Sequence, residues 1–247
     1  MSFSWKQLKS FTDARISLGR TGGSLTTEQL LKFRKDHALA KDAVWTDLNS
    51  EKIITELRSM GRDVILVDSQ AWDRRTFIQR PDLGRRLTKI SEEKLKARRG
   101  NYDISLCIAD GLSALAIENH AVSFLSFLLP LIRSFRLAPI TLVNQGRVAV
   151  SDQIGELLGS ALSIVLVGER PGLSSPDSMG IYMTYKPKAE NTDEKRNCIS
   201  NIRKEGLSYD FAAQKLAFLI SESLRRKLSG VELKDTFEPN SILPPKE

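Results

Sequence analysis

From residue 51 onward, short apolar segments alternate with amphipathic helical segments. Continuous apolar runs predict strands at Val64–Val67, Ile104–Ala109, Ile140–Val143, Ile164–Val167 and Ile181–Tyr185. Helical spacing before, between and after them predicts helices near Glu51–Met60, Ser91–Arg99, Ser113–Phe135, Asp152–Leu158 and Tyr209–Lys227. Strands that are apolar throughout and alternate with helices are typical of a parallel sheet covered on both faces. The pattern therefore predicts an α/β fold, Rossmann-like and doubly wound, with a mainly parallel sheet.

The first 50 residues follow a different pattern. The segment FTDARISLGRTGGS is cationic and rich in Gly, with a turn expected at Gly22-Gly23. A helix is predicted to begin near Thr26, where Gln29 is placed for a capping box. One face of this helix collects Leu30, Phe33, His37, Ala40 and Val44. We therefore expect an N-terminal helical arm that packs on the main domain or on another subunit.

The expected domain boundaries follow from these patterns. Residues 1–50 are expected to form the arm and its helix, residues 51–230 the Rossmann-like domain, and residues 231–247, rich in Pro and charge, an irregular tail.

The composition, 41% hydrophobic and 27% charged, is that of an ordinary soluble globular protein. The most apolar stretch, AVSFLSFLLPLI, contains Pro130 and is shorter than the ~20 residues that span a bilayer, so it predicts a buried helix and no membrane partner.

The net charge of +7 allows two interpretations. One is a nucleic-acid surface, and the other is a scattered basic surface that meets an acidic partner. Basic residues occur in pairs along the chain, such as Arg74-Arg75 and Arg85-Arg86, without interleaved aromatic residues. This pattern favours the second interpretation, so no nucleic-acid partner is expected.

Familiar catalytic motifs are absent from the sequence. The first predicted strand leads into VDSQAWDRR, without the glycines of a dinucleotide site, and GRTGGSLT lacks the lysine of a P-loop. His37, Cys107, His120 and Cys198 show no zinc-ligand spacing, so each is expected at an interface or in the core. Ser113 nearly matches a nucleophile elbow but is better interpreted as a helix N-cap. The shortage of general bases indicates a binding module or a partner subunit.

Polar segments at strand ends are the candidate ligand sites. Three of them follow predicted strands, namely ADGLS, NQGRVAVSD and GERPGLSS. Their glycines allow close backbone approach to a ligand, and such loops gather at the carboxyl edge of a parallel sheet. A fourth segment, RNCISNI at residues 196–202, fits neither a helix nor a strand repeat, so we expect it to be an ordered polar loop.

Five segments carry a family resemblance. In chain order, FTDARISLGRTGGS, ADGLSALAIEN, GRVAVSDQIGELL, GERPGLSSPDSMG and RNCISNI resemble the small (light) subunit of adenosylcobalamin-dependent ethanolamine ammonia-lyase. The resemblance implies a Rossmann-like domain that helps to hold adenosylcobalamin (coenzyme B12) against a large TIM-barrel subunit. That large subunit would bind ethanolamine, and the complex would convert it by radical chemistry to acetaldehyde and ammonia.

The resemblance also implies three cofactor-binding positions: Val148 in GRVAV, Glu169 in GERPG and Cys198 in RNCIS. Val148 would contact the apolar corrin, and Glu169 would accept hydrogen bonds from its amide arms or hydroxyls. Cys198 would pack as a small polarizable group or offer its backbone N–H. Taken alone, each residue also has a structural explanation: Val148 as a core residue at a strand end, Glu169 as a solvent-exposed partner of Arg170, and Cys198 as a buried thiol. No catalytic residue and no metal ligand are expected in this chain.

Two other functions remain open at this stage. One is a free-standing α/β enzyme that binds a nucleotide-like ligand, and the other is a basic interaction module without a ligand.

The N-terminus lacks the apolar core of a secretory signal, and two cysteines form no disulfide framework, so a cytoplasmic location is expected. The family also implies delivery to a bacterial microcompartment, but few residues precede Phe11 to carry a targeting extension.

Overall fold

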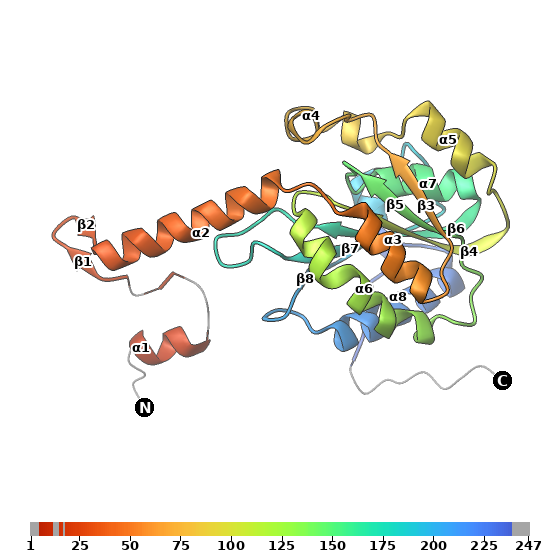
Figure 1. Ribbon diagram of the computed structural model, residues 1–247. Helices are drawn as coiled ribbons and strands as arrows, with labels where there is room; N and C mark the ends of the chain where they lie inside the picture. The colour runs from red at the N-terminus through yellow and green to blue at the C-terminus, as the bar shows by residue number, and fades with distance from the viewer. Residues whose placement is uncertain (1–4, 12–14, 17, 239–247) are drawn as a thin grey trace.

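The protein is described from a computed structural model that covers residues 5–11, 15–16 and 18–238. Parts of the expected arm and the end of the expected tail, residues 1–4, 12–14, 17 and 239–247, lie outside the described residues. The described chain forms one α/β body, from which a long N-terminal arm extends (Figure 1).

A six-stranded sheet forms the centre of the body. Its order is β3-β5-β4-β6-β7-β8. The strands are β3 (Val64–Asp68), β4 (Tyr102–Ala109), β5 (Ile140–Asn144), β6 (Ser160–Gly168), β7 (Met179–Tyr185) and β8 (Arg196–Ile202). The first four in the sheet order run parallel, whereas β7 and β8 are antiparallel to their neighbours. All five predicted strands are confirmed.

Helices cover both faces of the sheet (Figure 1). On one face lie α3 (Ser50–Ser59), α6 (Ala114–Leu131) and α8 (Tyr209–Arg226), and on the other lie α5 (Lys89–Lys96) and α7 (Val150–Leu158). Because side chains alternate along a strand, Leu106 and Ile108 enter the first core while Cys107 and Ala109 enter the second. The architecture is therefore mixed α/β with a mainly parallel sheet. The order of its first three strands, β3-β5-β4, differs from the 3-2-1 order usual for a Rossmann fold.

Helix α6 is long and apolar enough to cross a membrane by length and composition alone. Half of its apolar window is buried inside the protein, where it packs against the sheet and α8. Its side chains Phe124, Leu125 and Leu128 are fully buried. The helix is thus part of the hydrophobic core in this fold.

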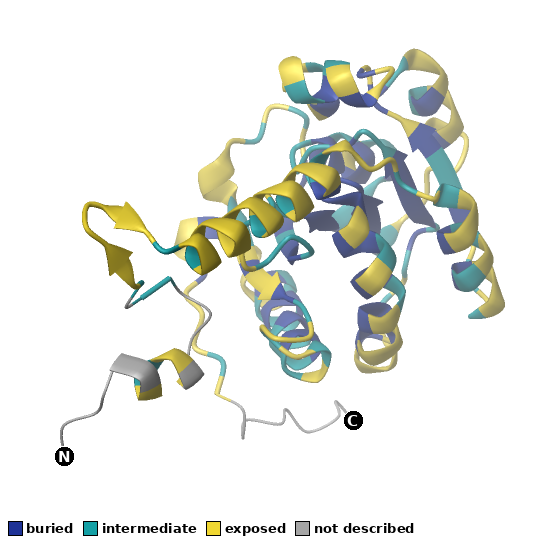
Figure 2. Ribbon diagram, turned by 60° about the vertical axis from the view of Figure 1, so that its left-hand side comes forward, coloured by how far each residue is buried: buried dark blue, intermediate teal, exposed yellow. Residues whose placement is uncertain are grey.

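The arm consists of α1 (Trp5–Leu8), the 3₁₀ turn η1 (Lys9–Phe11), a hairpin of β1 (Arg20–Thr21) and β2 (Ser24–Leu25), and α2 (Thr27–Trp45). Thr26 caps α2 as predicted, because its Oγ1 accepts a hydrogen bond from the Gln29 N–H at 3.4 Å. Figure 2 shows α2 exposed along most of its length, and Ala43 is its buried residue. Leu30 and Phe33, on the predicted apolar face, are 39% and 38% exposed. Most of the arm therefore lacks a partner within the described chain.

The prediction of a loop at residues 196–202 is wrong, because RNCISNI forms the edge strand β8. Only Ile199 and Ile202 are buried along it, and a register shift against β7 interrupts the alternation of its side chains. Asn201 has a φ of 63°, which further breaks the strand repeat. An edge strand with one open face therefore lacks the apolar pattern by which sequence analysis recognises strands.

Several short elements were also not predicted. These are α4 (Arg74–Gln79) and the 3₁₀ turns η2 (Leu83–Arg85), η3 (Asp193–Lys195) and η4 (Gly230–Glu232). The segment expected to be an irregular tail packs back on α8 as far as it is described. Leu233 is 3% exposed, and the Phe237 ring lies 5.4 Å from that of Phe211.

Candidate functional site

The antiparallel strands β7 and β8 extend the sheet beyond the helices α5 and α7. On β7, Ile181 and Met183 point into the core under α6 and α8, while Tyr182 points to the opposite face. Tyr182 pairs with Cys198 of β8, and Cys198 is exposed. Since α7 packs on β4 and β6, the neighbouring part of this face is open to a ligand or a partner.

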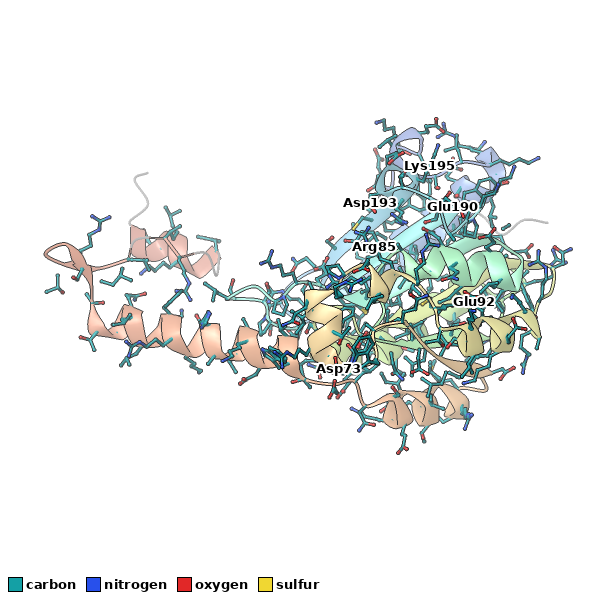
Figure 3. The ribbon with its side chains drawn as sticks, turned by 90° about the horizontal axis from the view of Figure 1, so that it is seen from above. Asp73, Arg85, Glu92, Glu190, Asp193 and Lys195 are labelled. Atoms are coloured by element: carbon teal, nitrogen blue, oxygen red, sulfur yellow. The ribbon has the colours of Figure 1, made fainter. Side chains whose placement is uncertain are left out.

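A pocket of ≈ 430 Å³ lies where this open face meets the start of α7. It is lined by Arg85, Arg147, Val148, Ala149, Tyr182, Asp193, Arg196 and Cys198. Two of these residues, Arg85 and Asp193, are labelled in Figure 3 and come from distant parts of the chain. The structure thus brings Val148 and Cys198, 50 residues apart in sequence, to one pocket. Tyr182, Arg85, Arg147 and Arg196 were missed by the sequence analysis.

Glu169 lies beside this pocket and does not line it. Its Oε2 accepts hydrogen bonds from the Ser178 Oγ at 2.5 Å and from the Asn201 N–H at 3.3 Å. A Cβ added to Gly180 would lie 2.8 Å from Oε1, so the missing side chain makes room for the carboxylate. Burial raises the pKa of Tyr182, and the nearby Cys198 and Glu169 raise it further. Glu169 therefore shares the open face with Tyr182 and Cys198, and its hydrogen-bond partners are Ser178 and Asn201 rather than Arg170.

A buried ion pair supports the floor of the pocket. The Arg196 Nη2 lies 2.5 Å from the Asp152 Oδ2, and the two side chains are 3% and 1% exposed. Arg196 also contacts Asp193, whose side chain is exposed. Burial raises the pKa of Asp152, while the positive charge of Arg196 lowers it. The pair fixes β8 to the first turn of α7, and so it fixes Cys198 relative to Val148.

A second pocket, of ≈ 500 Å³, lies at the carboxyl ends of β3, β5 and β4. Asp110 stands at its base and accepts hydrogen bonds from the Gln145 and Gly146 N–H groups at 3.0 and 2.8 Å. Burial raises the pKa of Asp110 to about 6, against the opposing effects of Arg74 and of these backbone N–H groups. Trp72, 77% exposed, is among its lining residues. The carboxyl-edge segments ADGLS and NQGRVAVSD therefore do meet, as the strand order of a parallel sheet requires.

The remaining candidate residues have structural roles. Ser113 caps α6, since its Oγ accepts a hydrogen bond from the Ala116 N–H at 3.2 Å and donates one to the Pro176 carbonyl. His120 is buried, with Nδ1 2.6 Å from the Tyr209 hydroxyl and Nε2 3.2 Å from Asp177. Cys107 is a core residue, as predicted, and His37 lies on the exposed arm. Within the described residues, no group of three His, Cys, Asp or Glu side chains is arranged to hold a metal ion.

The fold and the site together define a class of protein. A mixed α/β body with a pocket on an open sheet face, and an exposed arm that is mostly without a partner within the described residues, is typical of proteins that work as subunits of larger assemblies. The model of one family, described as ethanolamine ammonia-lyase light chain (EutC), matches residues 3–234. The chain belongs to this family, which confirms the resemblance found in the sequence.

Curated relatives agree with the family match. The chain is 51% identical over 240 residues to the ethanolamine ammonia-lyase small subunit of Azotobacter vinelandii, covering 95% of this chain and 89% of that protein. It is 49% identical over 244 residues to the protein of the same name from Pseudomonas fluorescens Pf-5, covering 96% and 89%. The Pseudomonas aeruginosa PAO1 protein of this name is 50% identical over the same length and coverage. The family implies a B12-dependent lyase, and the small-subunit name implies a large partner subunit.

Proposed function

We propose that this chain helps to hold adenosylcobalamin at the pocket between the open face of β7 and β8 and the start of α7. A large TIM-barrel subunit would close the pocket from the other side and bind ethanolamine. The observation that carries the proposal is that Val148 and Cys198 line one pocket, with Glu169 on the same open face. The fold would then serve as a Rossmann-like cobalamin domain, and we propose a cytoplasmic location, free or within a microcompartment.

The residues present fit such a cofactor. A corrin is a broad apolar ring fringed by amide groups that donate and accept hydrogen bonds. The pocket offers Val148, Ala149 and the Tyr182 ring as apolar contacts for the corrin, and Asp193 as a polar contact for its amide groups. Glu169 adds a carboxylate on the same face, which can accept hydrogen bonds from amide N–H groups. Apolar contacts with a few well-placed polar groups are typical of cofactor sites.

The chain's share of the reaction is binding and orientation. When bound, the cofactor's cobalt–carbon bond would supply the radical that starts the conversion of ethanolamine to acetaldehyde and ammonia. Tyr182 and Val148 would exclude water from one side of the cofactor, and Glu169 would hold its amide fringe. The pocket contains no pair of acid and base arranged for ethanolamine among the described residues. The chain alone is therefore expected to lack lyase activity.

The proposal is tested by filling the pocket. Val148→Trp adds an indole where the corrin would lie, so it should raise the dissociation constant of adenosylcobalamin for the complex with the large subunit by at least about tenfold, or ~1.4 kcal/mol. Ile90→Trp is the matched control, because Ile90 is 73% exposed and does not line the pocket. Spectroscopic titration with adenosylcobalamin measures both, and circular dichroism checks that each variant folds.

Two results would contradict the proposal. One is an unchanged adenosylcobalamin affinity in a folded Val148→Trp complex. The other is turnover of ethanolamine by the purified chain without a large subunit, which would instead favour a free-standing enzyme.

A further inference from the structure

Two arginines at this pocket form no ion pair within the described chain. Arg85 forms no ion pair or side-chain hydrogen bond within the described chain, although it lines the pocket. Arg147 donates from Nη2 to the Phe77 carbonyl at 2.9 Å, and its Nε is buried without a hydrogen-bond partner. Arg196, the third arginine of the pocket, is compensated by Asp152 and Asp193. Neither Arg85 nor Arg147 is thus paired with a carboxylate within the described residues, and both guanidinium groups can pair with an external anion.

The backbone holds these two arginines close together. The Arg147 N–H donates to the Gly84 carbonyl at 2.8 Å, which joins η2 to the segment before α7. A Cβ added to Gly84 would lie 2.8 Å from the Arg147 Cγ, so the absent side chain lets Arg147 pass beside Arg85. Arg147 also stacks on the Phe77 ring at 4.4 Å, which fixes its guanidinium. Burial lowers the pKa of Arg147, and the positive charges of Arg85 and Arg74 lower it further, while the negative charge of Asp110 opposes them. Like charges held together in this way favour a bound anion.

The start of α7 adds backbone donors to the same place. Its N-cap residue, Ala149, forms no side-chain capping bond. The N–H groups of Val148 and Ala149 have no hydrogen-bond partner among the described residues, and both residues line the pocket. Free N–H groups and the positive end of a helix dipole favour anions, and phosphate above all. Arginine's fork of donors matches the oxygens of a phosphate in the same way.

We infer that Arg85, Arg147 and the uncapped start of α7 form a phosphate-binding site, and that its occupant is the phosphodiester of the cofactor's nucleotide loop. This inference rests on the proposed cofactor role of the pocket. It adds the orientation of the cofactor, since the nucleotide loop would lie toward η2 and α7 and the corrin toward Tyr182 and Cys198. Free phosphate is the other source of the same chemistry.

The test compares two corrinoids. Adenosylcobalamin carries the nucleotide loop, whereas adenosylcobinamide has the same ring without the phosphodiester and its nucleoside. Titrated into the complex with the large subunit, Arg85→Met should weaken adenosylcobalamin binding by about ten- to 100-fold and leave adenosylcobinamide binding unchanged. Arg86→Met is the matched control, because the neighbouring Arg86 is exposed and outside the pocket. Arg147→Lys, which keeps the charge but not the fork, should show the same selectivity with a smaller loss.

Inorganic phosphate provides a second measurement. It should compete with adenosylcobalamin for the wild-type complex and not for the Arg85→Met complex. Equal loss of both corrinoids, or no loss of either, would overturn the inference while leaving the cofactor role intact. Phosphate binding that depends on Arg85, with unchanged adenosylcobalamin affinity, would make free phosphate the occupant and overturn the assignment to the nucleotide loop. If the wild-type complex bound no adenosylcobalamin, the proposed function would fall, and phosphate binding alone would decide whether the anion site exists.

Discussion

The Arg74 Nη1 lies 3.4 Å from the Asp110 Oδ2, and the two side chains are 6% and 1% exposed. Arg74 also donates from Nε to the Val44 carbonyl at 2.6 Å and from Nη1 to the Gly111 carbonyl at 2.8 Å. A single guanidinium thus joins the last turn of the arm helix α2 to the loop that follows β4. The base of the arm and the carboxyl edge of the sheet are therefore one structural unit.

Removing Arg74 should destabilise the fold strongly. Arg74→Met would leave the buried Asp110 carboxylate without its cation and the Gly111 carbonyl without a donor, which costs about 3–5 kcal/mol in comparable buried pairs. Arg80→Met is the control, because Arg80 pairs with Asp82 at the surface, where both side chains are more than half exposed. Urea denaturation should show a large fall in the free energy of unfolding for the first variant and little change for the second. Equal stability of the two variants would show that the Arg74–Asp110 pair does not support the fold.

The titration of Asp110 should give stability an unusual pH dependence. Burial raises its pKa to about 6, whereas an aspartate in an unfolded chain has a pKa of ~3.9. Between these values the folded state binds more protons, so the contribution of Asp110 to stability falls as the pH rises from ~4 to ~6 and is constant above that. Asp110→Asn removes the titration. The free energy of unfolding of the wild type minus that of Asp110→Asn should therefore decrease across this window, and a difference that increases with pH would contradict the raised pKa.

The parallel part of the sheet could be predicted from the sequence because its side chains are mostly apolar and its central strands β4, β5 and β6 are largely buried on both faces. Strand β3, at the other edge of the sheet, is only partly buried, but Val64–Val67 is still an unbroken apolar run. The edge strand β8 could not be predicted, because one of its faces is open and a register shift breaks its alternation. Helix α4 was missed for a related reason. It is six residues long and begins with Arg74, a charged residue that is nonetheless buried.

The candidate site could likewise be predicted from the sequence only in part. Val148, Glu169 and Cys198 were identified from the family resemblance, and no spacing in the sequence brings them together. Their proximity depends on the antiparallel pairing of β7 with β8 and on the buried pair of Arg196 with Asp152. Both are contacts between residues distant in sequence, which a single sequence does not specify. The uncompensated charge of Arg85 likewise becomes visible only when its neighbours are known.

Glu169 should affect cofactor binding more than stability. If its carboxylate accepts hydrogen bonds from the cofactor in a desolvated interface, Glu169→Ala should cost about 1–3 kcal/mol, a roughly five- to 150-fold rise in the dissociation constant. Glu169→Gln keeps an acceptor oxygen, so it should lose less. Glu190→Ala, at an exposed carboxylate labelled in Figure 3, is the control. Titration of adenosylcobalamin into the four complexes decides the question, and equal affinities throughout would remove Glu169 from the site.

The arm should stabilise the complex rather than the body. Along α2 the apolar side chains of Leu31, Leu39 and Trp45 are 58%, 47% and 50% exposed, so the described chain does not cover them. Exposed apolar groups on one element are typical of a surface that packs on another subunit, here the large subunit that the family implies.

Deleting residues 1–24, or introducing Leu31→Glu, should therefore weaken assembly with the large subunit in sedimentation velocity experiments. The melting temperature of the chain alone should stay nearly unchanged, because none of the described residues up to Ser24 is buried and Leu31 is exposed. Ala43→Glu is the positive control. It places a charge at a buried position near the base of α2, so it should lower the melting temperature. A large loss of stability on deletion of residues 1–24 would mean that the arm packs on its own domain.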